Sequence, residues 1–353
     1  MKEIDKSKPV MVTGATGYVA EWLVKLLLDQ GMTVHATVRN PMNKEKLSVL
    51  EKLAEEADGT IKFFKADLLH PHSFKEAMEG CELVYHTASP FFLDVVDPKE
   101  ELVEPALRGT QNVLEQANET ESVQRVVLTS SVAAIYGDNI DLKKSVTGKF
   151  TEKDWNTTSS LTHGAYMYSK ILAEREAWKI YDAQDRWDLV VINPSFVMGP
   201  AIDPKHVTSE SFKLIKKMGN GTFKSGLPSL ACGVVDVRDV AIAHFRAGIF
   251  TGVEGRYIVS GHDASLLKMS TELIPVYGDS YPLPTKLVPK WLLWFLGPMM
   301  DKSLSRRFIR KNIGLRCIMD NTKSKDDLKM IYRPMHETMQ EMFQQLIDHQ
   351  LLK

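Results

Sequence analysis

A tyrosine and a lysine four residues apart, Tyr166 and Lys170, lie in the stretch Tyr166-Met-Tyr-Ser-Lys170. Residues at this spacing share one face of a helix. An ammonium group beside a phenol stabilises the phenolate and lowers its pKa, so the tyrosine can exchange protons nearer to neutral pH. Tyr168 cannot form the same pair, because Leu172 stands four residues beyond it. The spacing is common, and an incidental pair on a surface helix is the alternative interpretation.

Two serines, Ser130 and Ser131, follow the apolar run Arg125-Val-Val-Leu-Thr129. We expect this run to be a strand, and ligands of open α/β sheets bind at the carboxyl ends of strands. A hydroxyl at that place can donate a hydrogen bond to a substrate carbonyl oxygen. Ser131 together with Tyr166 and Lys170 predicts proton exchange at the oxygen of a carbonyl or an alcohol.

A glycine-rich turn, Thr13-Gly-Ala-Thr-Gly-Tyr-Val-Ala20, links the first predicted strand to the first predicted helix. Gly14 permits a tight turn, and Gly17 lets the backbone approach a pyrophosphate beside the free N–H groups of the helix. Many turns contain glycines, but a place inside a βαβ unit makes this pattern specific. We predict cofactor contacts from Thr13, Gly14, Thr16, Gly17, Tyr18 and Val19.

The end of the second predicted strand discriminates between the two nicotinamide dinucleotides. Sites for NAD usually place an acidic residue there, whereas this chain has Arg39, followed by Lys44 and Lys46. An arginine can pair with a 2′-phosphate through two hydrogen bonds. An ordinary exposed arginine is the alternative. Because no acid competes at this position, we predict NADP(H) as the cofactor, bound by Arg39 and Lys46.

Other candidate cofactor contacts lie at the ends of predicted strands or just beyond them. Asp67 could accept a hydrogen bond from an adenine amino group, although a role in capping the next helix fits nearly as well. The remaining candidates of this kind are Leu68, Thr87, Ala88, Ser89 and Thr129.

Strand-like and helix-like segments alternate through the first half of the chain. Predicted strands span 10–13, 33–38, 61–64, 83–87, 125–129 and 189–192, and predicted helices span 18–30, 44–57, 71–80, 100–119 and 166–183. This alternation implies βαβ units, and nearly continuous apolar strands imply a sheet covered on both faces. We predict an α/β fold with a Rossmann-like, doubly wound parallel sheet.

The pattern loosens after Pro194. Glycine and proline are frequent over 219–228, whereas 236–250 and 335–352 look helical and 256–259 looks like a strand. We expect residues 1–194 to form the NADP(H)-binding domain, with 236–260 crossing back to it. Residues 195–235 and 261–353 then form a smaller, mostly helical C-terminal substrate lobe.

The motifs, taken in this order, resemble the extended short-chain dehydrogenase/reductase family over most of the chain. The likeness is greatest to the dihydroflavonol 4-reductase, cinnamoyl-CoA reductase and microbial aldehyde reductase group. It rests on Val12-Thr-Gly-Ala-Thr-Gly-Tyr-Val19, Ala36-Thr-Val-Arg39, Lys65-Ala-Asp-Leu68, Leu128-Thr-Ser-Ser131, Ser169-Lys-Ile-Leu-Ala-Glu174 and Gly255-Arg-Tyr-Ile258. Ala20 is a departure, because many relatives have glycine there.

The resemblance implies hydride transfer between a nicotinamide and the carbonyl carbon of an aldehyde or ketone. Tyr166 then acts as the general acid/base, Ser131 orients and polarises the oxygen, and Lys170 tunes Tyr166 and holds the nicotinamide ribose. The segment Ile192-Asn-Pro-Ser-Phe-Val-Met-Gly-Pro200 is similar to the family's passage beside the nicotinamide. It adds Pro194, Ser195 and Val197 to the predicted cofactor contacts.

The resemblance does not extend to a substrate pocket. The apolar candidates for its lining are Phe91, Phe92, Ile135, Met198 and Phe223, and an ordinary core role is at least as good for each. A nucleotide-sugar epimerase or a hydroxysteroid dehydrogenase on the same scaffold, or a non-catalytic NADP(H) sensor, is the alternative function. Val132 and Ala133 argue against a dehydratase, which carries acids there, and the tyrosine–lysine pair argues against a sensor.

Composition restricts the partners and the compartment. The net charge is −1 with both signs interspersed, which argues against nucleic acid. The three scattered cysteines, Cys81, Cys232 and Cys317, indicate reduced thiols, and the charged N-terminus lacks an apolar signal region. No residues have metal-ligand spacing. We expect a cytoplasmic monomer or homodimer with a small-molecule substrate, no nucleic-acid partner and no metal.

The apolar segment 287–300 includes Trp291-Leu-Leu-Trp-Phe-Leu-Gly-Pro-Met-Met300. It is well short of the ~20 residues that cross a bilayer. An interfacial membrane contact is one interpretation, because the basic run Arg306-Arg-Phe-Ile-Arg-Lys311 follows. A packed helix of the substrate lobe, or a flap over an apolar substrate, is favoured. We therefore expect no membrane contact, and the sequence leaves the role of this segment open.

Overall fold

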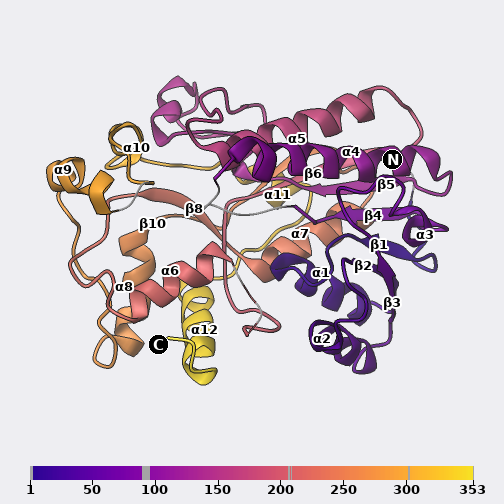
Figure 1. The fold of residues 1–353 in the computed structure, drawn as a ribbon, viewed down its shortest axis with the longest axis horizontal. Helices are drawn as coiled ribbons and strands as arrows, with labels where there is room; N and C mark the ends of the chain where they lie inside the picture. The colour runs from indigo at the N-terminus through magenta and orange to yellow at the C-terminus, as the bar shows by residue number, and fades with distance from the viewer. Residues whose placement is uncertain (1–2, 90–95, 206, 208, 301–302, 353) are drawn as a thin grey trace.

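A seven-stranded parallel sheet forms the centre of the molecule, in the order β3-β2-β1-β4-β5-β6-β9 (Figure 1). The structure is a computed structural model that describes residues 3–89, 96–205, 207, 209–300 and 303–352. The strand order reverses between β1 and β4, and open α/β sheets bind their ligands at the carboxyl ends of the strands at such a point. This topology confirms the predicted Rossmann-like, doubly wound fold.

Helices cover both faces of the central sheet. Its strands are β1 (Val10–Val12), β2 (Thr33–Val38), β3 (Thr60–Lys65), β4 (Leu83–His86), β5 (Arg125–Thr129), β6 (Asp188–Pro194) and β9 (Gly255–Val259). One face packs against α1 (Tyr18–Asp29), α2 (Lys44–Glu55) and α7 (Val237–Ile249). The other face packs against α3 (Lys75–Met78), α4 (Glu104–Glu119) and α5 (Ala165–Asp182) (Figure 1). Strands β1 and β4 are buried along their whole length, because both faces are covered.

Two helical predictions differ from the structure in their bounds. Helix α3 spans four residues rather than 71–80. His72 has a φ of 61°, which a right-handed helix cannot contain, so the helix starts only after it. A π-helical turn, Lys99–Val103, precedes α4 where one helix was predicted from residue 100. The short 3₁₀ helices η2 (Val132–Ala134) and η3 (Asn139–Lys144) were not predicted.

A second, three-stranded sheet lies beside the first and was not predicted. It consists of β7 (Phe196–Met198), β8 (Ala231–Asp236) and β10 (His262–Ser265), in the order β10-β8-β7. Its strands are short, and β10 reads His-Asp-Ala-Ser, so no apolar periodicity marks it. The other helices are α6 (Glu210–Gly219), α8 (Leu266–Tyr277), α9 (Lys290–Met300), α10 (Arg306–Asn312), α11 (Thr322–Asp326) and α12 (Met335–Asp348).

The C-terminal elements share an apolar core of their own. Met198, Phe212, Met339 and Phe343 are among its fully or almost fully buried members. Strand β9 pairs with β6, and α7 packs against α1, which supports the proposal that 236–260 returns to the cofactor domain. The division at residue 194 stays a proposal. None of the described helices combines the length and the apolar character needed to cross a membrane.

Candidate active site

Ser131, Tyr166 and Lys170 meet at the carboxyl edge of the central sheet. Ser131 lies two residues beyond β5 and caps η2, because its Oγ accepts a hydrogen bond from the Ala133 N–H at 3.1 Å. Tyr166 lies in the first turn of α5, and its hydroxyl is hydrogen-bonded to the Ser131 side chain. Lys170 follows one turn later on the same helix. The tertiary fold thus brings together three residues that the sequence singles out.

Lys170 connects α5 to the segment that follows β4. Its Nζ donates a hydrogen bond to Ser89 Oγ at 2.9 Å, three residues beyond β4. The same nitrogen lies 5.9 Å from the centre of the Tyr166 ring. The Lys170 side chain is buried, so its charge acts on Tyr166 and Ser89 with little screening by water.

The pKa shifts of this pair differ from the expectation. Burial raises the pKa of Tyr166 to about 12, and the hydrogen bond from Ser131 only partly opposes it. Burial also lowers the pKa of Lys170 to about 8, against the attraction of Glu174. The sequence predicts a lowered pKa for Tyr166; that prediction is wrong for this structure, because burial outweighs the hydrogen bond from Ser131. Tyr166 is therefore a protonated phenol at neutral pH and can donate its proton.

A buried carboxylate, Glu174, lies one turn beyond Lys170 and joins three strands to α5. Ser130 Oγ donates a hydrogen bond to its Oε2 at 2.5 Å, and Asn193 Nδ2 donates to the same oxygen at 2.8 Å. Arg256 Nε donates to Oε1 at 2.5 Å. Asn193 also donates to the backbone carbonyl of Ser131 at 3.1 Å. This network holds the backbone on which Ser131 stands.

Sequence reasoning missed Glu174, Asn193 and Arg256 as parts of the site. Glu174 is four residues beyond Lys170, and Arg256 is the second residue of an otherwise apolar strand, so both carry a signal. A charged residue within an apolar segment is buried only when it is paired. Which residue pairs with which depends on the tertiary fold, and spacing along the chain does not reveal it.

The glycine turn has the shape that a bound pyrophosphate needs. Gly14 has a φ of 62°, and a Cβ there would lie 2.9 Å from the Cβ of Ala88. Gly17 is the N-cap of α1, and no side chain caps that helix. Thr13 Oγ1 accepts the Ala88 N–H at 3.0 Å and so ties β1 to β4. The turn and the uncapped α1 terminus fit a dinucleotide.

Several predicted cofactor residues already have protein partners for their side chains. Thr129 Oγ1 donates to His244 Nε2 at 2.6 Å, because His244 Nδ1 donates to the Val240 carbonyl. Tyr18 donates its hydroxyl proton to the Gly199 carbonyl at 2.6 Å. Asp67 Oδ1 accepts the Leu69 N–H at 2.9 Å in a local turn, and it does not cap the next helix, since the N-cap of α3 is Phe74. These residues can approach a cofactor only with their backbone or their remaining atoms.

The other predicted cofactor residues lie around the same edge. Arg39 and Lys46 are exposed beyond β2, and neither forms an ion pair within the part of the chain that the structure describes. Thr87 donates to the Thr13 carbonyl at 2.5 Å, and Ser195 Oγ is buried without a hydrogen-bond partner. Gly14, Thr16, Val19, Leu68, Ala88, Pro194 and Val197 complete the set, and their role in cofactor binding stays a prediction.

The substrate pocket is the least defined part of the site. Phe91 and Phe92 lie outside the described residues. Met198 is fully buried in the C-terminal core, and Phe223 packs against that core. Both therefore have the ordinary core role that is the alternative to a place in the pocket. Ile135 lines a cavity of about 60 Å³. This volume is far below the few hundred Å³ of typical ligand pockets.

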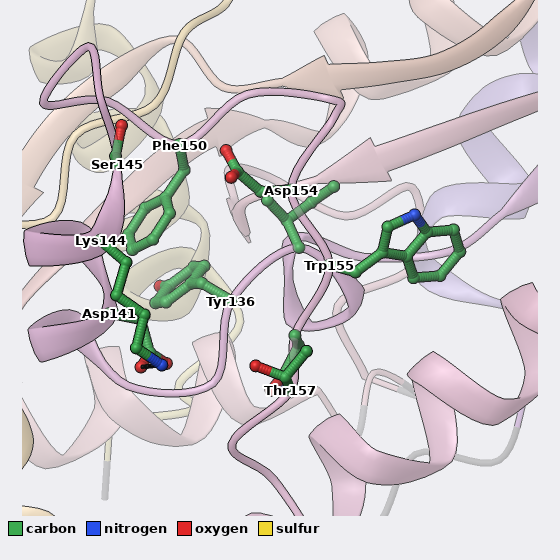
Figure 2. Close-up of a pocket in the computed structure, with 10 residues that line it drawn as sticks. Tyr136, Asp141, Lys144, Ser145, Phe150, Asp154, Trp155 and Thr157 are labelled. Carbon is green, nitrogen blue, oxygen red and sulfur yellow. Dashed lines mark hydrogen bonds and ion pairs between the residues drawn. The ribbon is translucent and has the colours of Figure 1, made fainter.

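Figure 2 shows this small cavity between η3 and residues 150–157. The rings of Tyr136 and Phe150 stack beside it with centres 4.4 Å apart. Trp155 lies on its other side, and the guanidinium of Arg256 lies 3.9 Å from the centre of the Trp155 ring. These contacts pack the loop behind Ser131, so the cavity belongs to the support of the site. The described residues contain no cluster of three potential metal ligands.

Comparison with known proteins supplies the family. The model of the NAD dependent epimerase/dehydratase family matches residues 10–249. The chain belongs to this family. Cinnamoyl-CoA reductase CAD2 of Medicago truncatula is 38% identical over 325 residues, 90% of this chain and 96% of that protein. The predicted resemblance to the extended short-chain dehydrogenase/reductase family is confirmed.

One further relative in sequence and one similar solved structure are also reductases by name. A bifunctional dihydroflavonol 4-reductase/flavanone 4-reductase of Malus domestica is 33% identical over 293 residues, 80% of this chain and 79% of that protein. The crystal structure of yeast methylglyoxal/isovaleraldehyde reductase Gre2 complexed with NADPH has a TM-score of 0.76 at 25% identity. It covers 98% of this chain and 100% of that one.

Proposed function

We propose that the protein is an NADPH-dependent reductase that converts the carbonyl of a small aldehyde or ketone to an alcohol. The hydrogen-bonded pair of Ser131 and a protonated Tyr166 carries this proposal, since it offers two hydroxyl groups to one substrate oxygen. The relatives reported above are reductases by name, and one of them was crystallised with NADPH.

In this proposal each residue near the carbonyl oxygen has a separate role. A bound nicotinamide supplies the hydride. Tyr166 donates its phenolic proton to the oxygen, and Ser131 donates a hydrogen bond that polarises the carbonyl. Lys170, hydrogen-bonded to Ser89, favours the transient phenolate and holds the ribose. In the reverse direction, Tyr166 accepts the proton of an alcohol.

Glu174 and Asn193 fix the position of Ser131 relative to Tyr166. Asn193 joins the Ser131 carbonyl to Glu174, and Glu174 lies on the same helix as Tyr166. The serine and the tyrosine therefore stand on a common rigid support. Such preorganisation lowers the cost of orienting the groups at the moment of reaction.

A substrate panel tests the function. Oxidation of NADPH and of NADH is followed with aromatic and aliphatic aldehydes, ketones, dihydroflavonols and cinnamoyl thioesters. We expect carbonyl-dependent oxidation of NADPH and little oxidation of NADH. Binding of NADPH with no consumption by any carbonyl would contradict the reductase and favour an epimerase or a cofactor sensor.

Arg39 is proposed to select NADPH over NADH through the 2′-phosphate. We expect Arg39→Ala to lower kcat/KM for NADPH by about tenfold to a hundredfold, the value of a charge-assisted hydrogen bond, with kcat/KM for NADH unchanged. Arg108→Ala is a matched control, since Arg108 is 65% exposed and lies on α4. Equal losses with both cofactors would remove Arg39 from this role.

A further inference from the structure

Helix α9 exposes an apolar face that nothing in the described chain covers. Trp291, Phe295 and Met299 follow one another at helical spacing and are 66%, 63% and 84% exposed. Leu296 and Met300 widen this face, with 44% and 79% exposure. Apart from Lys290 at its start, the helix has no polar side chain. Large contiguous apolar patches are uncommon on water-facing surfaces and mark contact sites.

The opposite side of α9 holds the helix in place. Leu293 and Gly297, one turn apart, are its buried residues, and Leu293 packs in a small cluster with Ile309 of α10. A Cβ at Gly297 would lie 3.2 Å from Ile309 Cδ1, so the two helices are closely packed. Packing thus accounts for one side of α9 and leaves the aromatic side outward. The sequence favours a packed helix over an interfacial membrane contact, and the exposure of the aromatic side now favours the contact.

Positive charge is concentrated around the same helix. Residues 280–319 contain eight lysines and arginines and one aspartate, so this segment carries +7 while the whole chain carries −1. Arg306, Arg307 and Arg310 of α10 are exposed, and none forms an ion pair with the described residues. Lys311, by contrast, is paired with Asp138 at 2.8 Å. The exposed arginines are available to an anionic partner.

Charge decides between the possible partners of this face. In a two-fold dimer the same patch would meet itself, and the exposed arginines of the two copies would repel one another. Helices that lie in a membrane interface combine an aromatic apolar side with nearby basic residues, and tryptophan prefers the headgroup level. Figure 1 places α9 and α10 at one end of the long axis, opposite β3, so a flat surface can reach them.

We propose that α9 docks the protein on the surface of an anionic lipid bilayer. Trp291, Phe295 and Met299 enter the interface, and Arg306, Arg307 and Arg310 bind the lipid headgroups. This contact is peripheral and does not involve the catalytic residues.

Vesicle flotation with the full-length protein tests the proposal. We expect binding to vesicles of phosphatidylcholine mixed with phosphatidylserine, little binding to phosphatidylcholine alone, and release at high salt. Trp291→Ser/Phe295→Ser should lower the partition coefficient by about tenfold or more. The matched control is Val146→Ser/Ile331→Ser, which removes apolar side chains that are 102% and 88% exposed elsewhere.

The charged half of the surface is tested separately. Arg306→Gln/Arg310→Gln should weaken binding by about tenfold or more, whereas Lys52→Gln/Lys179→Gln should not. Lys52 and Lys179 have side chains 74% and 75% exposed, so the control removes two exposed charges as well. All variants should retain the far-ultraviolet circular dichroism of the parent and its NADPH affinity, because α9 and α10 lie outside the proposed cofactor site.

Fluorescence locates the contact on the protein. Brominated lipids in the anionic vesicles should quench tryptophan emission of the parent, and Trp291→Phe should remove much of that quenching while binding persists. Absence of binding to anionic vesicles would overturn the proposal, as would equal losses in target and control variants. Sedimentation velocity showing a dimer that Trp291→Ser/Phe295→Ser dissociates would also overturn it, in favour of a second copy of the chain.

Discussion

Lys170 is a buried cation whose charge costs stability. Burial lowers its pKa from 10.5 to about 8, so the folded protein releases this proton at a lower pH than the unfolded chain. The cost is therefore present below about pH 8 and disappears as the pH rises toward the unfolded value. From the size of this shift it is roughly 3 kcal/mol at neutral pH.

Replacement of this lysine should therefore stabilise the folded protein. We expect Lys170→Met to raise the free energy of unfolding at neutral pH by about 1–3 kcal/mol, after the lost hydrogen bond to Ser89 is allowed for. The gain should shrink between about pH 8 and pH 10.5. Urea unfolding of both proteins at neutral and alkaline pH measures it. A destabilisation of equal size at both pH values would contradict this account.

The positions of the candidate site residues could be predicted because each combines a reactive type with a local spacing. Tyr166 and Lys170 need only one helical turn, and Gly14 and Gly17 need only one strand-to-helix turn. The direction of the Tyr166 pKa shift was not predictable, since it depends on how deeply the fold buries the phenol. The environment of a residue is a tertiary property, even where its position is a local one.

Among the secondary-structure elements, α5 is hydrogen-bonded through Glu174 to Arg256 of β9, to Asn193 of β6 and to Ser130, one residue beyond β5. Replacing this carboxylate with an amide leaves Arg256 buried without a countercharge. We expect Glu174→Gln to lower the free energy of unfolding by about 3–5 kcal/mol, as when one partner of a buried ion pair is removed. Chemical denaturation provides the measurement.

Glu176 on the same helix provides the matched control. Its carboxylate accepts hydrogen bonds from Gln111 and the exposed Lys179 at 3.0 and 3.1 Å. We expect Glu176→Gln to cost less than about 1 kcal/mol. If the two variants lose similar amounts, the Glu174 network does not anchor α5.

Helices and strands whose apolar residues follow a clear periodicity could be predicted from the sequence, and those without such a periodicity could not. The strands of the parallel sheet are continuously apolar, whereas β10 is polar along most of its length and is defined by its pairing with β8. Helix α3 was predicted too long because a positive φ at His72 has no signature in the apolar pattern.

Over the molecule as a whole, two buried neutral histidines connect the sheet to its surroundings. His86 is hydrogen-bonded to Thr13 between β4 and β1, and His244 joins α7 to β5. Burial lowers the pKa of His86 to about 3 and that of His244 to about 4. The unfolded chain therefore takes up these protons first, and stability falls as the pH drops below the unfolded pKa of about 6.5.

The share of the acid sensitivity that comes from His244 can be measured separately. Between about pH 7.5 and pH 5, His244 should account for roughly 2 kcal/mol of lost stability. In urea unfolding experiments over this pH range, we expect the free energy of unfolding of His244→Asn to fall by roughly 2 kcal/mol less than that of the parent. His349→Asn, at an exposed position, should behave like the parent. An unchanged pH dependence in His244→Asn would contradict the assignment.

The arrangement of the whole sheet followed from the alternation of strands and helices, because handedness and burial leave few ways to connect them. The exposed face of α9 did not follow, since its apolar residues are typical of a buried helix as well. Exposure depends on which elements the fold brings to each side of α9, and this is decided far away in the sequence.

The role of Tyr166 as proton donor is the central claim, and one comparison tests it most directly. Tyr166→Phe removes only the hydroxyl, and Tyr168→Phe makes the same change two residues away on α5. With a carbonyl substrate at saturating NADPH, we predict that Tyr166→Phe lowers kcat by about a hundredfold to ten-thousandfold, the value of general acid catalysis, with NADPH affinity retained. Tyr168→Phe should keep the kcat of the parent. A Tyr166→Phe variant with the parent's kcat would contradict the mechanism.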